Sequence, residues 1–314
     1  MVKAKLITDN IEKVIFGKTR EIQIVLACML TGGHVLLEDV PGTGKTMLAR
    51  AIAKSLDVTF SRVQFTPDLL PSELTGINFY SPKTGEFTFR KGSLFANIVL
   101  ADEINRATPR TQSGLLESME EYQVSVDGET YMLDKPYFVI ATQNPIETQG
   151  TFPLPEAQLD RFLVQMSLGY PDKAESVRVL KAGINEKPID SLTAVCTAEE
   201  FRDMMNSCSK VFIHDDLFTY IMDLATATRE HDGVSLGIST RGALALAKLA
   251  RSFTAIEGRE YVTPQDVVKL MPYVFAHRMT LRGSAKYRAS AVKTVLEDVI
   301  SRVKAPLEVW KESK

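Results

Sequence analysis

The sequence is poor in the features that mark secreted, zinc-binding and membrane proteins. It has 3 cysteines in 314 residues, and Cys28, Cys196 and Cys208 lie far apart with no C-x-x-C spacing. A disulfide framework or zinc site is therefore not expected, whereas buried thiols in a reducing cytoplasm fit this usage. No apolar run approaches the ~18 residues that span a membrane. The N-terminus also lacks the apolar core and cleavage site of a signal peptide.

The chain has no large surplus of charge of either sign. It carries 37 lysines and arginines against 39 acidic residues, and its formal net charge is −2. Broad nucleic-acid binding would favour a basic surplus, so nucleic acid is an unlikely partner. The histidines, at His34, His214, His231 and His277, are spread too widely to predict a metal site. Structural roles are expected for them.

Short apolar strands alternate with helical stretches as far as residue 170. Strands are predicted at 34–38, 59–64, 98–101 and 138–141, and helices at 45–56 and 109–121. Such alternation predicts a mainly parallel sheet with helices on its faces. The 66–94 and 121–136 segments interrupt it. Each has alternating residues around a turn, Ser81–Gly85 in one and Asp127-Gly128 in the other, so two inserted β-hairpins are predicted.

Beyond Tyr170 the strand signal stops, and helices are expected to the end of the chain. Thr197 with Glu200, and Thr263 with Asp266, have the spacing of capping boxes, which begin helices. The prediction is therefore an α/β domain at 1–185 followed by a small all-α domain at 186–314.

A glycine-rich loop connects the first predicted strand to the first predicted helix. This strand–loop–helix context favours a phosphate-binding P-loop over a plain turn. Gly42 and Gly44 let the backbone turn its N–H groups toward phosphates, and the helix N-terminus adds positive charge. Lys45 is expected to reach the β- and γ-phosphates, and the Thr46 hydroxyl to bind Mg²⁺. The full pattern has glycine at position 39, where this chain has Asp39. The predicted cofactor-binding residues of this loop are Pro41, Gly42, Thr43, Gly44, Lys45, Thr46 and Met47.

Two later apolar strands also end in polar side chains. Asp102 and Glu103 follow the strand at 98–101, and Asn144 follows the strand at 138–141. The carboxyl ends of parallel strands line the ligand crevice of an α/β sheet. Asp102 is therefore a candidate Mg²⁺ ligand, and Glu103 a candidate base for the attacking water. Asn144 could contact the γ-phosphate or that water, although this residue taken alone is better explained as a turn-forming asparagine before proline.

These motifs together resemble the AAA+ ATPases and, within them, the MoxR family. The similarity covers almost the whole chain and is strongest between residues 32 and 170. It implies a P-loop AAA+ core with two inserted hairpins and a small all-α lid, which hydrolyses ATP to ADP and phosphate with Mg²⁺. In this comparison 41–46 is the Walker A motif, Asp102 and Glu103 form Walker B, and Asn144 is sensor 1. The matching runs are 96–107, 112–120, 124–129, 140–147 and 150–162.

The segment 159–162, Leu-Asp-Arg-Phe, is similar to the family segment that carries an arginine finger. The resemblance implies that Arg161 reaches the γ-phosphate held by a neighbouring subunit. Such a finger can supply ~10³–10⁵ in rate. A local ion pair of Arg161 with Asp160 or Glu156 is the alternative.

Two further segments resemble family motifs. The run 238–243 is similar to the sensor-2 region of the lid, which makes Arg241 a candidate for reading ATP in its own subunit or across an interface. The run 15–17 resembles the N-terminal segment that packs on adenine, so Gly17 joins the predicted cofactor-binding residues. A plain turn after a helix is the alternative for 15–17.

The resemblance also implies a ring of identical subunits, six by family analogy. Hydrolysis in the ring would drive chaperone-like remodelling or assembly of a protein client, beside a separate partner with a von Willebrand A-type domain. The hairpins would be the helix-2 insert and the pre-sensor-1 hairpin, which contact the client. An ATPase subunit of a metal-chelatase complex is the alternative. A nucleic-acid motor would favour basic hairpin tips, whereas 121–136 has four acidic residues against one lysine. A nucleotide-dependent scaffold with little turnover would not need Glu103, Asn144 and Arg161 together.

Overall fold

The computed structural model describes residues 2–83, 85–144, 150–185, 188–283 and 288–306. The chain divides into two compact units, Met1–Ser207 and Cys208–Lys314. None of the helices in the described ranges is long and apolar enough to cross a membrane. All three cysteines are buried and outside any disulfide, as the sequence predicted.

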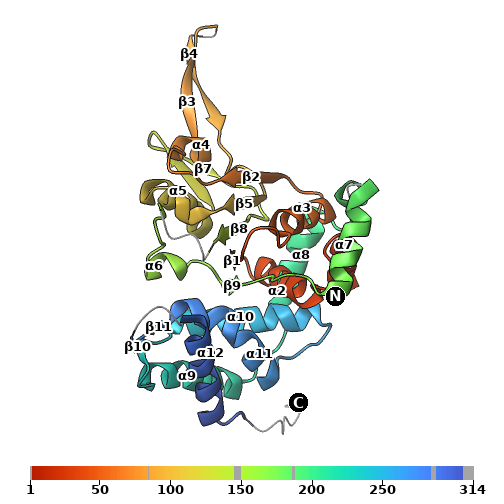
Figure 1. Cartoon of the computed structure of the whole chain (residues 1–314). Coiled ribbons are helices and arrows are strands. Elements are labelled where there is room, and N and C mark those ends of the chain that lie inside the picture. Colours follow the sequence, from red (N-terminus) through yellow and green to blue (C-terminus); the bar gives the residue numbers. More distant parts are fainter. Residues whose placement is uncertain (1, 84, 145–149, 186–187, 284–287, 307–314) are drawn as a thin grey trace. The chain divides into compact units, whose positions relative to one another are not determined.

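The first unit is built on a five-stranded parallel sheet (Figure 1) with the order β2-β5-β8-β1-β9. Its strands are β1 (Val35–Glu38), β2 (Phe60–Gln64), β5 (Ile98–Asp102), β8 (Phe138–Gln143) and β9 (Val164–Met166). The register sets Leu36 beside Ala141 and Leu100 beside Ile140. The four predicted strands are confirmed. Strand β9 was not predicted, because three residues are too few to show a period of two. It lies at the edge of the sheet and pairs with β1.

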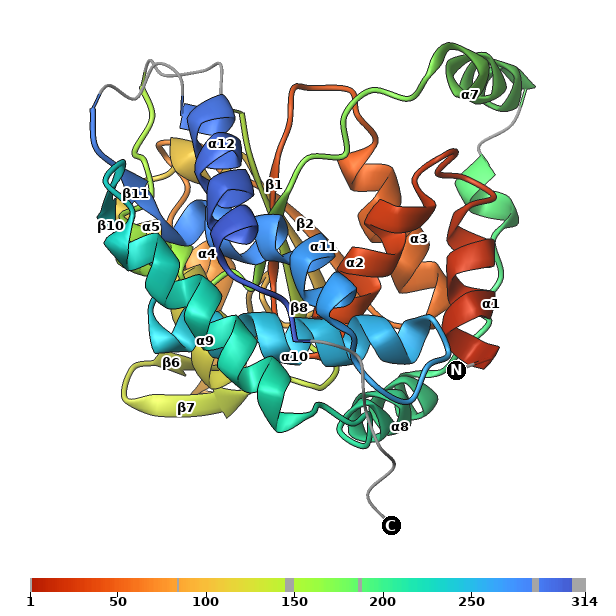
Figure 2. The same ribbon diagram turned by 90° about the horizontal axis from the view of Figure 1, so that it is seen from below.

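Helices cover both faces of this sheet. On one face, inward side chains of three strands, including Leu36, Val99 and Val139, form a buried cluster with Leu115 and Met119 of α5. Figure 2 shows α5 on one side of the strands and the group of α1, α2 and α3 on the other. The helices concerned are α1 (Val2–Ile11), α2 (Thr19–Leu30), α3 (Lys45–Ser55) and α5 (Pro109–Glu121).

Both predicted hairpins are present in the first unit. The first, after the short helix α4 (Pro71–Thr75), consists of β3 (Gly76–Ser81) and β4 (Glu86–Lys91), and it projects from the body of the unit (Figure 1). The second consists of β6 (Gln123–Val126) and β7 (Glu129–Met132). The two hairpins touch, because the ring of Phe89 stacks on that of Tyr131 with centroids 3.9 Å apart. A hydrogen bond of 2.9 Å from Asn78 to Asp127 adds to this contact.

The segment from 188 to 207 packs with the rest of the first unit. Its elements are η2 (Pro188–Ser191) and α8 (Ala198–Cys208), after α6 (Glu156–Leu159) and α7 (Lys173–Asn185). Asn10 of α1 donates to the carbonyl of Thr193 at 3.0 Å, and Ser55 of α3 accepts from the N–H groups of Val195 and Cys196. The division of the units after Ser207 therefore differs from the predicted boundary at 185/186, since these contacts tie 188–207 to α1 and α3.

The second unit is mainly helical, as predicted. Ser239 accepts a hydrogen bond from the N–H of Gly242 and so begins α10, and Thr263 begins α11 with a capping box. A short antiparallel pair of strands, β10 with β11, was not expected, because these strands are only three and two residues long. The elements are α9 (Asp215–Glu230), β10 (Val234–Leu236), α10 (Thr240–Ile256), α11 (Pro264–Phe275), η3 (Ala276–Arg278), β11 (Thr280–Leu281) and α12 (Arg288–Arg302).

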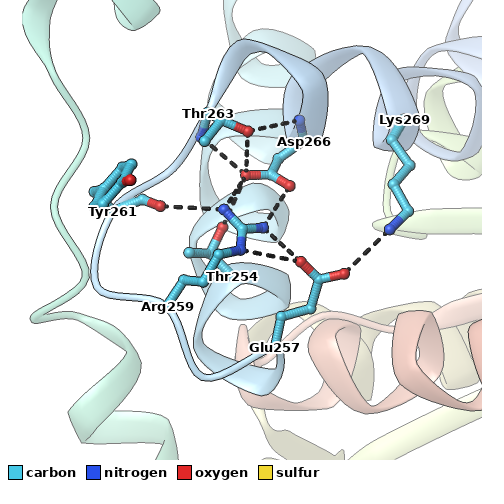
Figure 3. Close-up of polar contacts among 7 residues, drawn as sticks. All are labelled: Thr254, Glu257, Arg259, Tyr261, Thr263, Asp266 and Lys269. Atoms are coloured by element: carbon cyan, nitrogen blue, oxygen red, sulfur yellow. Dashed lines mark hydrogen bonds and ion pairs between the residues drawn. The ribbon is translucent and has the colours of Figure 1, made fainter. Parts of the chain in front are cut away.

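An ion-pair network joins the end of α10 to the start of α11 (Figure 3). Arg259 donates to both carboxylate oxygens of Asp266, at 2.6 and 2.8 Å, and also bonds Glu257, which Lys269 contacts at 3.1 Å. Burial raises the pKa of Asp266, but the hydrogen bonds from Arg259 and Thr263 outweigh it and hold this pKa below its usual value. The Asp266 carboxylate therefore stays charged and fixes the turn between the two helices.

Candidate functional site

Three polar motifs meet at one edge of the parallel sheet. Strands β5, β8 and β1 are neighbours and run in the same direction, so their carboxyl ends lie side by side. The glycine-rich loop follows β1, Asp102 and Glu103 end β5, and Asn144 follows β8. In open α/β sheets this edge is where ligands bind. The structure thus brings together motifs that are far apart in the sequence.

The glycine-rich loop has the backbone that its sequence predicts. Gly42 and Gly44 have φ angles of 88° and 92°, and Gly44 is the N-cap of α3. A Cβ at Gly42 would meet no atom within 4 Å, so the left-handed backbone rather than crowding requires glycine there. The ammonium of Lys45 donates to the carbonyl of Asp39 at 3.0 Å, which turns it back over the loop.

A threonine that the sequence analysis did not select organises the two carboxylates. The Thr142 hydroxyl donates to Asp102 Oδ1 at 2.6 Å and accepts from the N–H of Glu103 at 2.9 Å. Thr142 is fully buried on β8, between β5 and β1. Arg62 of β2 binds the other oxygen of Asp102 at 2.7 Å. These contacts depend on the strand order, which the sequence did not reveal.

Glu103 is held in an uncommon conformation. Its φ of 57° is in the left-handed region, which costs a non-glycine residue roughly 1–3 kcal/mol. Its Oε2 accepts from Gln64 of β2 at 2.8 Å and from Arg106 at 3.0 Å. The Glu103 side chain keeps 25% of its surface exposed, so water can reach it. Arg62 and Gln64 are two positions apart on β2, so their side chains point to the same face of the strand. This spacing was the signal in the sequence that could have predicted their common role.

The remaining predicted ligands fit a nucleotide with Mg²⁺. Asn144 is 8% exposed at the end of β8, while the matching run continues into 145–147, outside the described residues. Within the described part of the chain no group of three or more His, Cys, Asp or Glu could hold a metal by itself. A magnesium ion that also binds phosphate and water needs only one or two protein oxygens. The Thr46 hydroxyl and the Asp102 carboxylate have the required chemistry.

The N-terminal segment 15–17 lies beside the glycine-rich loop. A Cβ at Gly44 would be 3.9 Å from Cδ1 of Ile15. Gly17 has a φ of 67°, and the carboxylate of Glu175 occupies the space that a Cβ at residue 17 would need. Both the positive φ and the nearby carboxylate therefore favour glycine at position 17.

The chain resembles known proteins over nearly its full length. Residues 34–164 match the model of the ATPase family associated with various cellular activities (AAA), and residues 226–301 match the AAA lid domain. "Chaperone MoxR1" of Mycobacterium tuberculosis is 37% identical over 307 residues, which cover 95% of this chain and 81% of the relative. "Protein MoxR" of Paracoccus denitrificans is 31% identical, with 91% of each chain covered.

The chain belongs to the MoxR family of AAA+ ATPases. A crystal structure of a candidate ATPase from Cytophaga hutchinsonii is 36% identical and superposes with a TM-score of 0.88, over 98% of this chain and 96% of that one. "Uncharacterized protein YeaC" of Bacillus subtilis is 48% identical over 301 residues, which are 96% of this chain and 94% of the relative. These similarities establish the fold class and an ATP hydrolase activity.

Two arginines complete the site residues predicted for this MoxR-family ATPase, Arg161 in the first unit and Arg241 in the second. Arg161 follows α6 and forms an ion pair with Glu120 of α5, at 3.3 Å, with 32% of its side chain exposed. Asp160 and Glu156 were the partners considered from the sequence. Arg241 is in the first turn of α10, in the second unit, and is exposed.

Proposed function

We propose that this MoxR-family ATPase binds ATP and Mg²⁺ where β5, β8 and β1 end. The observation that carries the proposal is the Thr142 hydroxyl, which ties Asp102 and Glu103 to the strand beside the glycine-rich loop. Backbone N–H groups of 42–46 and the ammonium of Lys45 would bind the phosphates. Mg²⁺, held by Thr46 and Asp102, would supply positive charge to the phosphate oxygens.

In this proposal Glu103 acts on the attacking water and Asn144 orients it. The Glu103 carboxylate combines solvent access with fixed hydrogen bonds from Gln64 and Arg106. Because these donors restrain its rotation, the base would wait in one orientation for the water. Correct placement of a base contributes ~10²–10⁴ to a rate.

The enzyme would work as a ring, with six subunits by family analogy. Arg161 would leave Glu120 and reach the γ-phosphate bound by the neighbouring subunit. Both partners of the Arg161–Glu120 pair are about one-third exposed, so Arg161 can change partners at little cost, because surface ion pairs contribute only ~0–1 kcal/mol. Arg241 would be the corresponding contact from the lid.

The output would be chaperone-like remodelling or assembly of a protein client. Support comes from the name of the MoxR1 relative and from the projecting β3–β4 hairpin, where Tyr80 and Phe87 are 55% and 74% exposed. The stacked rings of Phe89 and Tyr131 would make the two hairpins move together. A separate von Willebrand A-type protein would be the working partner, in a reducing cytoplasm. An ATPase subunit of a metal-chelatase complex is the alternative, and its client would be a metal-inserting subunit.

The test is ATP turnover per subunit measured against protein concentration, with particle mass followed in parallel. Wild type is compared with Glu103→Gln and Arg161→Ala, and Glu120→Gln serves as the control that releases Arg161 without removing it. We expect turnover to rise as rings form. Both site variants should lose it, while Glu103→Gln still binds ATP.

A wild type that turns over equally well as a dilute monomer, together with an unaffected Arg161→Ala, would refute the trans finger. The metal-chelatase alternative predicts stimulation of turnover by a chelatase partner subunit. A von Willebrand A-type partner alone would not stimulate it.

A further inference from the structure

Asp39 stands where the P-loop pattern has glycine, and its side chain has an unusually complete set of partners. It is 4% exposed. Its carboxylate accepts from the hydroxyl of Ser167 at 2.6 Å, and from the N–H groups of Leu168 and Gly169 at 2.7 and 3.1 Å. Hydrogen bonds to a charged group are about twice as strong as neutral ones. This carboxylate therefore joins the start of the phosphate-binding loop to a segment more than a hundred residues away.

The segment held by Asp39 continues to the N-terminal residues 16–18. We call residues 167–178 the strap. At Tyr170 its carbonyl accepts from the ammonium of Lys18 at 3.3 Å. Farther on, Glu175 lies against Gly17, and the guanidinium of Arg178 lies over the ring of Phe16 at 4.4 Å. The strap thus runs from the phosphate-binding loop to the N-terminal segment beside it.

The strap begins directly after β9 with the buried side chain of Leu168, which is 3% exposed, and beyond Gly169 it is held mainly by these polar contacts. In both views α7 lies on the outside of the first unit (Figure 1, Figure 2). No side chain described in α7 is buried, and Leu180 and Ile184 are 65% and 76% exposed. An isolated helix of this length is marginally stable in water. The buried side chain of Leu168 and the polar contacts at Asp39 therefore hold the start of the strap, and the contacts at 16–18 hold its continuation.

We propose that Asp39 is a positioning residue that anchors the strap to the phosphate-binding loop and so sets how long nucleotide stays bound. With Asp39 in place, the strap presses on Phe16 and Gly17 and keeps the segment 15–17 against Gly44. Without it, the N–H groups of Leu168 and Gly169 lose their acceptor and the strap loosens at that end. Asp39 touches no reacting atom, so hydrolysis of bound ATP proceeds as before. The inference rests on the nucleotide site proposed above.

The experiment measures dissociation of fluorescent ADP from the full chain, after a chase with unlabelled ADP. Variants are Asp39→Asn, which keeps the shape and removes the charge, and Ser167→Ala, which removes one of the three donors. Asp57→Asn, at an exposed position after α3, is the matched control. Losing a charge-assisted anchor should speed release about 10-fold or more in Asp39→Asn, and about threefold in Ser167→Ala. Single-turnover hydrolysis should stay at the wild-type rate. Hydrogen exchange should increase in both 15–18 and 167–178.

Each other outcome is decisive. Wild-type ADP release in a folded Asp39→Asn chain with a lowered melting temperature would overturn the inference, because the residue would then be structural only. Slower single-turnover hydrolysis with unchanged release would overturn it as well. If Asp39→Asn does not fold, Ser167→Ala decides, and unchanged release in that variant refutes the anchor. Failure of the wild type itself to bind ADP would instead refute the proposed nucleotide site.

Discussion

His34 predicts a specific loss of stability at mildly acidic pH. It is 3% exposed between β8 and α5. Its Nδ1 accepts from the N–H of Val139 at 3.0 Å, so the proton is on Nε2, which donates to the carbonyl of Met119 at 2.9 Å. A second proton would have no acceptor at Nδ1. Burial therefore lowers the pKa of His34 from 6.5 to about 4, although the bond to Met119 opposes this change.

The sign and size of the effect follow from linkage. The unfolded chain takes up a proton at this histidine near pH 6.5, whereas the folded chain does not until about pH 4. Stability is therefore complete above pH 6.5 and falls as the pH drops from 6.5 toward 4. The loss between pH 7.5 and 5.5 amounts to about 1.3 kcal/mol, and the full loss to roughly 3 kcal/mol.

The assay is urea unfolding followed by circular dichroism at pH 7.5 and 5.5, for wild type and His34→Gln. The substitution removes the titrating group, so its unfolding free energy should change by about 1.3 kcal/mol less than that of wild type between the two pH values. His214→Gln, in the second unit, is the control. In the unfolding transition that His34→Gln alters, this control should show the same difference in unfolding free energy between pH 7.5 and 5.5 as wild type. An equal pH dependence in wild type and His34→Gln would refute the reasoning.

Three further predictions follow from single contacts. Thr142→Val keeps the shape of the side chain and removes its hydroxyl, so the turnover number for ATP should fall roughly 10- to 100-fold with little change in ADP affinity. Thr142→Ser should restore the turnover number. A matching loss of ADP affinity in Thr142→Val would contradict this prediction. Gly44→Ala meets a left-handed φ of 92°, and its Cβ would make only an ordinary van der Waals contact with Ile15, so the first unit should lose about 1–2 kcal/mol in urea unfolding. An unchanged midpoint would contradict the backbone argument. Asp266→Asn should destabilise the second unit by about 2–3 kcal/mol at pH 7, less than a fully buried pair because Arg259 is 32% exposed. Since the pKa of Asp266 is depressed, the difference in unfolding free energy between Asp266→Asn and wild type should persist above the ordinary pKa of 3.8 and disappear as the pH falls below it. A difference that stays constant at low pH would count against the ion pair.

Local features explain which parts of this protein could be predicted. The three central strands, β1, β5 and β8, were recognised because apolar residues fill most of their positions, as buried parallel strands require. The loop at 41–46 was recognised because glycine is needed where φ is positive. The β6–β7 hairpin was found from Asp127-Gly128, whose φ angles of 52° and 83° are those of its turn.

Contacts between distant segments decided the rest. The order of the strands in the sheet places β8 between β5 and β1. Only this order brings the Thr142 hydroxyl to Asp102 and Glu103. Asp39 appeared in the sequence as a departure from a glycine pattern, and its partners at 167–169 became known only from the fold. The sequence by itself determined the elements and the chemical groups, because backbone preferences act over a few residues. Tertiary structure alone decided which of these groups meet, because hydrogen bonds across the sheet depend on strand order and register.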